Sequence, residues 1–173
     1  AAVAIVLAVL VTGVLAEKKG MLAEAKMASI QKRIAKEVFR FHVLANSDSE
    51  EDQELKMKVK GEVISYMKED LPYSDGVEMT KAWARTHTDE LEEVAAQVIK
   101  ESGYDYSVKA EVTTCYFPDK TYGDVTFPEG DYEALRIEIG EAKGQNWWCV
   151  LYPNLWFIDA GNAVVREEGK EEL

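Results

Sequence analysis

The segment from Tyr104 to Tyr116 alternates with a period of two residues over its whole length. Side chains along a strand point to opposite faces in turn, so this alternation predicts one long strand, which Pro118 ends. One face would carry Tyr104, Tyr106, Val108, Ala110, Val112, Thr114 and Tyr116, and the other Asp105, Ser107, Lys109, Glu111 and Thr113. A strand of this kind constrains the fold, because its apolar face has to be covered by a second layer.

Three further segments predict strands. Val38 to Leu44 alternates in the same way, and Asp131 to Ile139 places its large aliphatic residues on one face. Asn146 to Tyr152 lies between the turn-rich link 140–144 and Pro153. We expect the long strand to pair with Asp131 to Ile139.

Between the strands predicted at Val38–Leu44 and Tyr104–Tyr116, the apolar residues recur at helical spacing. Leu55, Val59, Val63, Met67 and Leu71 recur at steps of four, with the oxygen-bearing side chains of Asn46, Ser47 and Asp48 placed to cap the helix start. A second helix is predicted from about Thr80 to Ser102, with Gly103 as its left-handed C-terminal residue.

The order strand, helix, helix, strand, strand, strand predicts an α+β two-layer sandwich, with an antiparallel or mixed sheet and two helices on one face. A chain of 173 residues suits one such domain, which we assign to residues 38–160. Residues 161–173 are expected to form an acidic, solvated tail.

The first 16 residues, AAVAIVLAVLVTGVLA, carry no charge. They are short for a helix that must cross about 30 Å of hydrocarbon, so a signal-peptide core fits better, with small residues before a cleavage point after Ala16. Cleavage and retention as a membrane anchor both remain open, and a buried apolar helix is the alternative. Residues 17–37 predict an amphipathic connecting helix or, equally, a solvated tether.

The chain has 32 acidic and 20 basic residues, a net charge of −12. This balance argues against a nucleic acid partner, since phosphates are neutralised by clustered Lys and Arg. The basic residues of the stretch 17–40 lie next to the apolar start, which makes contact between residues 1–40 and a membrane surface an open alternative.

Enzymatic chemistry has one candidate. Cys149 and His42 could form a thiol hydrolase pair if their strands were neighbours, with Asp48 or Asn46 orienting the imidazole. The apolar run around Cys149 argues against it, because nucleophilic cysteines usually need a cationic setting that lowers their pKa. Cys115 and Cys149 are compatible with one disulfide, but a bridge requires adjacent strands, so we favour two free thiols.

Metal and cofactor sites are not expected. The chain has two histidines, His42 and His87, and no Cys-x-x-Cys or His-Glu-x-x-His pattern. Its glycines form no phosphate-binding motif.

Aromatic residues are denser near the C-terminal half than a core alone explains. Trp147 and Trp148 are adjacent, so one should face the helices and the other the open side of the sheet. Exposed Trp, Tyr and Arg are typical of interface hot spots. We therefore expect a partner-binding face made by Lys120 and Tyr122 on a connecting loop, Arg136 on its strand, and Trp147 and Trp148.

Two blocks of the chain carry a resemblance. RFHVLANSDSEEDQELKMKVK at residues 40–60 and CYFPDKTYGDVTFPEGDYEALRIEIGEAKGQNWWCVLYPNL at residues 115–155 resemble the stage II sporulation protein R family. The family commonly has a second Cys where this chain has Trp156, so no disulfide through that position is carried over.

The resemblance implies a non-catalytic signalling protein of sporulation. Family members are exported into the space between forespore and mother cell, where they activate a membrane-embedded aspartic protease. That protease then processes a sigma-factor precursor.

Overall fold

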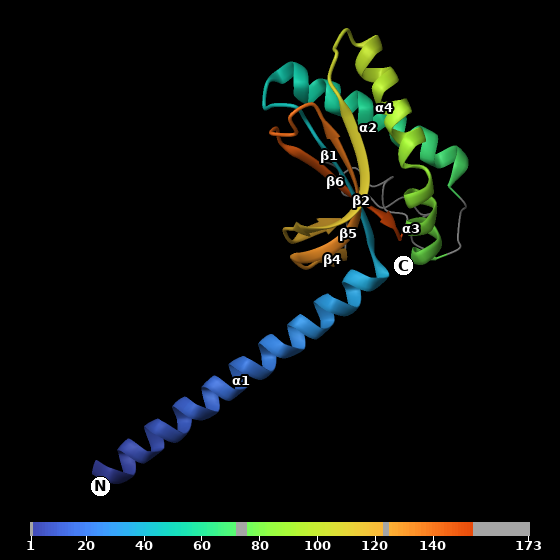
Figure 1. Cartoon of the computed structure of the whole chain (residues 1–173). Helices are drawn as coiled ribbons and strands as arrows, with labels where there is room; N and C mark the ends of the chain where they lie inside the picture. Colours follow the sequence, from blue (N-terminus) through green and yellow to red (C-terminus); the bar gives the residue numbers. More distant parts are fainter. Residues whose placement is uncertain (1, 72–75, 123–124, 154–173) are drawn as a thin grey trace. The chain divides into compact units, whose positions relative to one another are not determined.

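The computed structural model describes residues 2–71, 76–122 and 125–153. For residues 2–17, 122 and 125 it describes the backbone only. The chain divides into two compact units, Ala1–Ile34 and Ala35–Leu173. The first unit is formed by helix α1 (Ala2–Glu37) up to Ile34, and the second holds the last turn of α1, the remaining helices and the strands (Figure 1).

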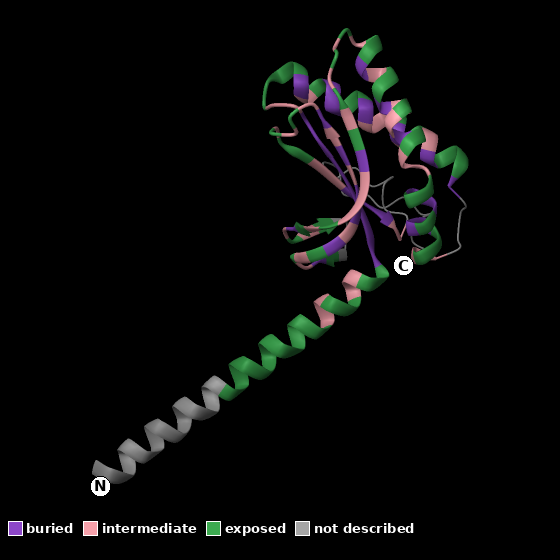
Figure 2. Ribbon diagram, in the orientation of Figure 1, coloured by how far each residue is buried: buried purple, intermediate pink, exposed green. Residues whose placement is uncertain are grey.

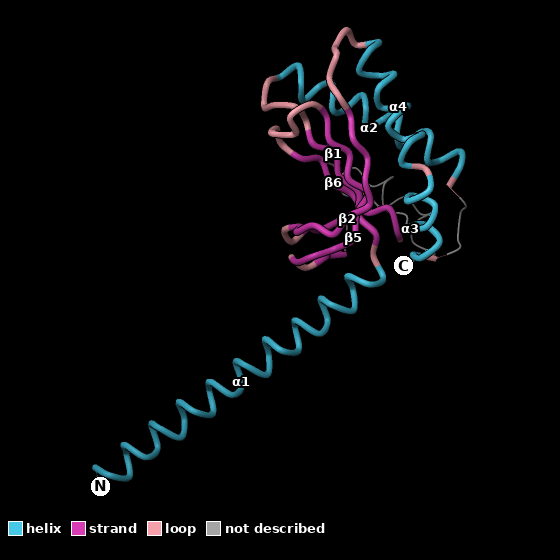
Figure 3. Tube along the Cα trace, viewed as in Figure 1, coloured by secondary structure: helices cyan, strands magenta, loops and turns pink. Residues whose placement is uncertain are grey.

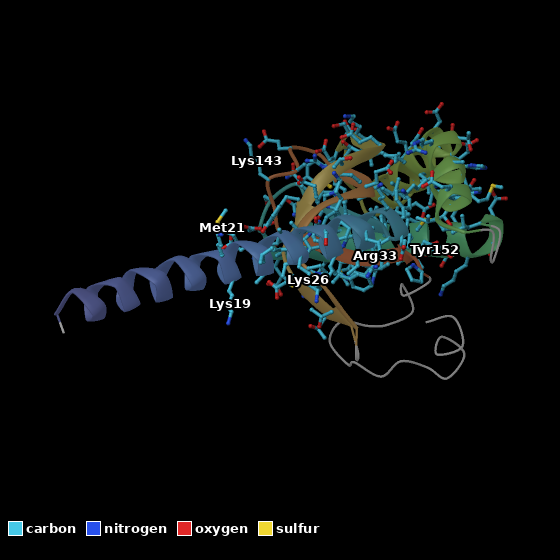
Figure 4. The ribbon with its side chains drawn as sticks, turned by 90° about the horizontal axis from the view of Figure 1, so that it is seen from below. Lys19, Met21, Lys26, Arg33, Lys143 and Tyr152 are labelled. Atoms are coloured by element: carbon cyan, nitrogen blue, oxygen red, sulfur yellow. The ribbon has the colours of Figure 1, made fainter. Side chains whose placement is uncertain are left out.

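Helix α1 includes residues 17–37, for which the sequence predicts an amphipathic connecting helix or a solvated tether. Met21, Leu22 and Met27 are exposed on it, and Lys19 and Met21 project from opposite sides of the helix (Figure 4). Among the residues searched in the described part of the chain, no helix is both long and apolar enough to cross a membrane. The side chains of residues 1–16 lie outside the described residues, so the export signal stays a prediction.

Four strands form a mixed sheet in the second unit (Figure 3). They are β1 (Phe39–Leu44), β2 (Val108–Phe117), β5 (Gly130–Ile139) and β6 (Asn146–Tyr152), in the spatial order β2-β5-β1-β6. Strand β1 runs parallel to β5 and antiparallel to β6, and β2 runs antiparallel to β5. The predicted pairing between the long strand and Asp131–Ile139 is confirmed.

Three helices pack on one face of this sheet: α2 (Glu50–Asp70), α3 (Val77–Thr86) and α4 (Thr88–Glu101). Buried residues line the facing sides of the two layers (Figure 2). The core combines the predicted step-of-four residues of α2 with alternate strand residues such as Phe41, Val43, Leu135 and Ile137. The α+β two-layer sandwich predicted from the sequence is therefore confirmed.

The cap of α2 differs from the prediction. Ser49, not one of the three residues before it, is the N-cap, and its Oγ accepts a 3.2 Å hydrogen bond from the Asp52 backbone N–H. Asn46 and Ser47 instead donate to the buried Asp52 carboxylate, at 2.8 and 2.5 Å. Their side chains are used to hold the end of β1 against α2 rather than to cap the helix.

The helix predicted from Thr80 to Ser102 is two helices that meet at His87. His87 has non-helical φ and ψ of −115° and 19°, and its ring stacks on Trp83 with centroids 4.4 Å apart. The apolar period continues through this single residue, which is why periodicity did not reveal the break. Gly103 follows α4 with φ 85°, as predicted for its C-terminal residue.

Two more boundaries require correction. Strand β2 starts at Val108 rather than Tyr104, because the Tyr104 N–H bonds back to the Ile99 carbonyl at 3.1 Å and the Tyr104 and Tyr106 rings stack on each other. The segment predicted as a connecting loop forms a hairpin of β3 (Lys120–Tyr122) and β4 (Val125–Phe127), a two-stranded sheet of its own.

One edge of the main sheet is partly closed by a side chain. The Ala110 backbone N–H on β2 donates to Glu92 Oε1 of α4 at 2.8 Å.

The loop that follows β5 touches the loop that follows β1. Gly144 lies so close to Ser47 that a Cβ on residue 144 would fall 2.1 Å from the Ser47 carbonyl oxygen. A glycine is required at this position for the two loops to touch.

Candidate functional site

The sheet face opposite the three helices is the candidate site. Alternation along each strand sends one set of side chains toward the helices and the other set to this open face. The open-face set contains Arg40 and His42 from β1, Arg136 from β5, Cys115 and Phe117 from β2, and Trp148 from β6.

Arg40 is the largest fully buried side chain among the described residues, with no exposed surface. Its guanidinium carbon lies 4.2 Å from the centroid of the Phe117 ring, 5.0 Å from that of Tyr132 and 6.0 Å from that of Phe127. Contacts of this kind are worth up to about 2 kcal/mol when desolvated. None of its three side-chain nitrogens has a hydrogen-bond partner among the described residues, and each orphaned donor costs about 1–3 kcal/mol.

His42 lies two residues further along β1 and is also buried. Its Nε2 lies 3.5 Å from Cys115 Sγ, whereas its Nδ1 has no partner in the described part of the chain. Burial lowers the pKa of His42 to about 4, and the charges of Arg136 and Arg40 act in the same direction. The imidazole is therefore neutral at physiological pH.

Cys115 does not have the properties of a nucleophile. Burial raises the pKa of its thiol, and this effect outweighs the opposite effect of Arg136 and Arg40. With His42 neutral, the two groups form a thiol–imidazole contact rather than a thiolate–imidazolium pair.

Arg136 is the register partner of His42 on the neighbouring strand β5. Its Nη2 forms an ion pair with Glu138, while its buried Nε has no partner among the described residues. Two guanidinium groups and one neutral imidazole therefore share this part of the open face.

The structure separates the residues predicted for partner binding. Trp148 lies on the open face, with its ring 6.3 Å from that of Phe117. Trp147 lies on the helix face. Its ring is edge-on to that of Phe41, with centroids 5.9 Å apart, and Lys60 Nζ lies 4.8 Å from the centroid of the Trp147 ring. Arg136 is on the open face and the partly exposed Lys120 is on the hairpin.

Tyr122 belongs to β3, but its side chain lies outside the described residues. The sequence therefore grouped residues that the fold distributes over two faces and a separate hairpin.

The thiol hydrolase pair is not assembled. Cys149 pairs with Phe41 in the β1–β6 register and faces the helices, whereas His42 pairs with Trp148 and faces the opposite side. Burial raises the pKa of the Cys149 thiol well above its ordinary value. Asn46 contacts Asp52, and Asp48 accepts a hydrogen bond from the Gln145 N–H, so neither orients His42.

Both cysteines are free. They belong to the two outer strands of the four-stranded sheet, β2 and β6, and face opposite sides. No group of three metal-ligating side chains occurs among the residues searched in the described ranges.

Sequence reasoning missed Arg40 as a site residue. The sequence feature that could have identified it is the position of Arg40 within the otherwise largely apolar strand segment FRFHVL, residues 39–44. A charged residue with that surrounding is rarely buried without a partner.

Comparison with known proteins decides the family. A family model described as stage II sporulation protein R matches residues 35–162. The chain belongs to the stage II sporulation protein R family. It is 34% identical over 140 residues to the stage II sporulation protein R of Bacillus subtilis (strain 168), and the alignment covers 80% of this chain and 62% of that protein.

This chain therefore spans less than two thirds of that relative. The matched region includes the whole described sheet and its helices. No solved structure matches the chain.

Proposed function

We propose that this member of the stage II sporulation protein R family is an exported signalling protein. It acts between forespore and mother cell by binding the outer surface of a membrane-embedded aspartic protease, which then processes a sigma-factor precursor. The observation that carries the proposal is the family match over residues 35–162.

The open face of the sheet is the surface we assign to the protease. Helices α2, α3 and α4 pack on the other face of the sheet, and this face presents Trp148 and Arg136, residue types that dominate binding energy at interfaces. The β3–β4 hairpin adds Lys120 and Tyr122. Trp147, on the helix face, would support this surface through packing.

A non-catalytic role is consistent with the chemistry of the site. The predicted Cys149–His42 pair is split between two faces, and the thiol that does contact His42 is held protonated by burial. Neither arrangement supplies an activated nucleophile.

Co-expression tests the function. The chain with an export signal is produced in cells that carry the cognate protease and a tagged sigma-factor precursor, and precursor cleavage is followed by immunoblot. We expect cleavage with this chain and none without it. A folded and exported chain that leaves the precursor intact would reject the proposal.

A pair of double variants tests the surface. Lys120→Ala with Tyr122→Ala should abolish cleavage, because losing an interface anchor typically costs about 2 kcal/mol or more, roughly thirtyfold in affinity. Gln97→Ala with Lys100→Ala, at exposed positions of α4, is the matched control and should cleave as the parent does. Equal signalling by both variants at equal export would move the binding surface away from the hairpin.

A further inference from the structure

Buried nitrogen atoms without partners are concentrated in one place. Among the described residues, the buried side-chain N and O atoms that lack a hydrogen-bond partner are Arg40 Nε, Nη1 and Nη2, His42 Nδ1 and Arg136 Nε. All belong to three neighbouring open-face residues: Arg40 and His42 are two apart on β1, and Arg136 is the register partner of His42. Unpartnered buried polar atoms are rare, and randomly placed ones would be spread over the domain. Their concentration in three neighbouring residues indicates a common cause.

Four of these five atoms share one chemistry. The guanidinium nitrogens of Arg40 and Arg136 are donors only, so the group that completes them has to be an acceptor. The fifth atom is Nδ1 of the neutral His42 ring, which donates when it carries the ring proton. An oxygen-bearing anion satisfies several donors at once, and a guanidinium fork matches a carboxylate in particular.

Charge counting narrows the class of anion. The charge of Arg136 is already matched by Glu138 through their ion pair, and His42 is neutral. The charge of Arg40 has no anionic partner in the described part of the chain. The cluster thus carries one uncompensated positive charge, which fits a singly charged carboxylate better than a doubly charged phosphate.

The surroundings fit the same ligand. Phe117, Tyr132 and Phe127 form apolar walls around the Arg40 guanidinium, which strengthens its interaction with an anion by excluding water. Cys115, Arg136 and Trp148 are partly exposed, so the cluster meets solvent on their side.

We propose that Arg40, His42 and Arg136 form a carboxylate-binding site on the open face of the sheet. The carboxylate is either a free small acid or a carboxylate of a polypeptide. The site belongs to the isolated chain, so it stands or falls independently of the protease proposed above. Because Arg40 has no exposed surface, side chains around it must move as the ligand enters, and we expect slow exchange between free and bound states.

Nuclear magnetic resonance of the ¹⁵N-labelled full chain tests the site. Sodium acetate is titrated against sodium chloride at constant ionic strength, with the Arg Nε–H and His imidazole nitrogens observed. We expect a saturable response of Arg40 and Arg136 to acetate alone, with the pKa of His42 rising toward its ordinary value. A response that does not saturate, or that chloride reproduces, overturns the proposal, as does tighter binding of inorganic phosphate than of acetate.

Arg40→Met separates a ligand role from a structural one. Methionine keeps the apolar length and removes the unpartnered charge, so the variant should melt no lower than the parent while its acetate affinity falls at least tenfold. Arg136→Gln should also weaken acetate binding. Lys143→Met, which removes a cation from an exposed loop position, should bind as the parent does. A large fall in the melting temperature of Arg40→Met would make Arg40 a structural residue and reject the site.

A peptide arm identifies the source of the carboxylate. A short peptide ending in a free carboxylate is compared with its C-terminally amidated form and with acetate. Tenfold tighter binding of the free peptide, lost on amidation, assigns a polypeptide ligand. Equal affinity for acetate and peptide assigns a free small acid, and binding of neither rejects the proposal.

Discussion

Cys115 Sγ lies 3.5 Å from His42 Nε2, although their strands β2 and β1 are separated in the sheet by β5. The register places Ala134 of β5 midway, since Cys115 pairs with Tyr132 and His42 with Arg136. Only a small side chain at that point lets the two meet above the middle strand. Replacing Ala134 with Leu should separate them and destabilise the domain by about 1–3 kcal/mol through overpacking.

The two thiols should differ sharply in reactivity. Cys115 is half-buried and Cys149 fully buried, and burial raises the pKa of both. We expect slow alkylation of Cys115 in the folded protein and modification of Cys149 only on global unfolding. Peptide mass spectrometry after timed iodoacetamide labelling measures both rates. Equal native-state rates, or a dominant Cys115–Cys149 linked peptide without reduction, would contradict the structure.

His42 should make the domain sensitive to mild acid. Burial, then Arg136 and Arg40, lowers the pKa of His42 to about 4 in the folded state, against about 6.5 in an unfolded chain. The unfolded state therefore binds more protons between these values, so the stabilisation is complete above about pH 6.5 and is lost as the pH falls toward 4.

The effect is up to about 3 kcal/mol in the free energy of unfolding. Urea unfolding at pH 7.5 and pH 5 measures it, with His42→Gln as the variant that cannot titrate. The parent should lose clearly more stability than His42→Gln over this interval. Equal losses would mean that other groups carry the dependence.

Asp52 should be the most sensitive polar position of the α2 start. It is buried, and its carboxylate accepts from Asn46 and Ser47. Asp52→Ala leaves both donors without their acceptor. We therefore expect the free energy of unfolding, measured by chemical denaturation, to fall by about 2–4 kcal/mol. Glu51→Ala, at the exposed neighbouring position, should change stability by less than about 0.5 kcal/mol.

Lys81 and Glu133 fasten α3 to β5. Lys81 is buried, with its Nζ 2.9 Å from a Glu133 oxygen and 3.0 Å from a Glu78 oxygen. Glu133→Ala removes the partly buried acceptor and should destabilise by about 2–4 kcal/mol. Lys81→Met, which removes the buried charge itself, should cost less. Thermal unfolding of both variants measures the two losses. A larger loss for Lys81→Met than for Glu133→Ala would show that the ion pair itself adds stability, rather than only neutralising a buried charge.

Much of the fold could be predicted from local patterns. The step-of-four run of α2 and the alternation in β2 and β5 each reported which face meets the core, because burial enforces those periods. The break at His87 could not be predicted, since one non-helical residue leaves the apolar period unchanged. The N-cap was misplaced for a related reason: four adjacent residues, Asn46 to Ser49, all carry cap-forming side chains, and tertiary contacts decide which one is used.

The candidate site was harder to predict than the fold. The split of Trp147 and Trp148 between two faces follows from alternation alone. The contact between His42 and Cys115 depends on strand order, and the parallel pairing of β1 with β5 joins residues far apart in sequence. Arg40 needed the same information, because its burial comes from Phe117, Phe127 and Tyr132 on later segments.

The strand order has a consequence for how the domain matures. Strand β1, first in the chain, pairs only with β5 and β6, which come last among the described strands. Such high contact order delays folding until distant segments are available. A chain that emerges from a ribosome or a translocation channel N-terminus first would hold Phe39, Phe41 and Val43 without their partner strands until β5 and β6 have emerged. In a chain threaded in this way, the sheet cannot be completed until its last strands have emerged, so the topology delays formation of the ordered domain.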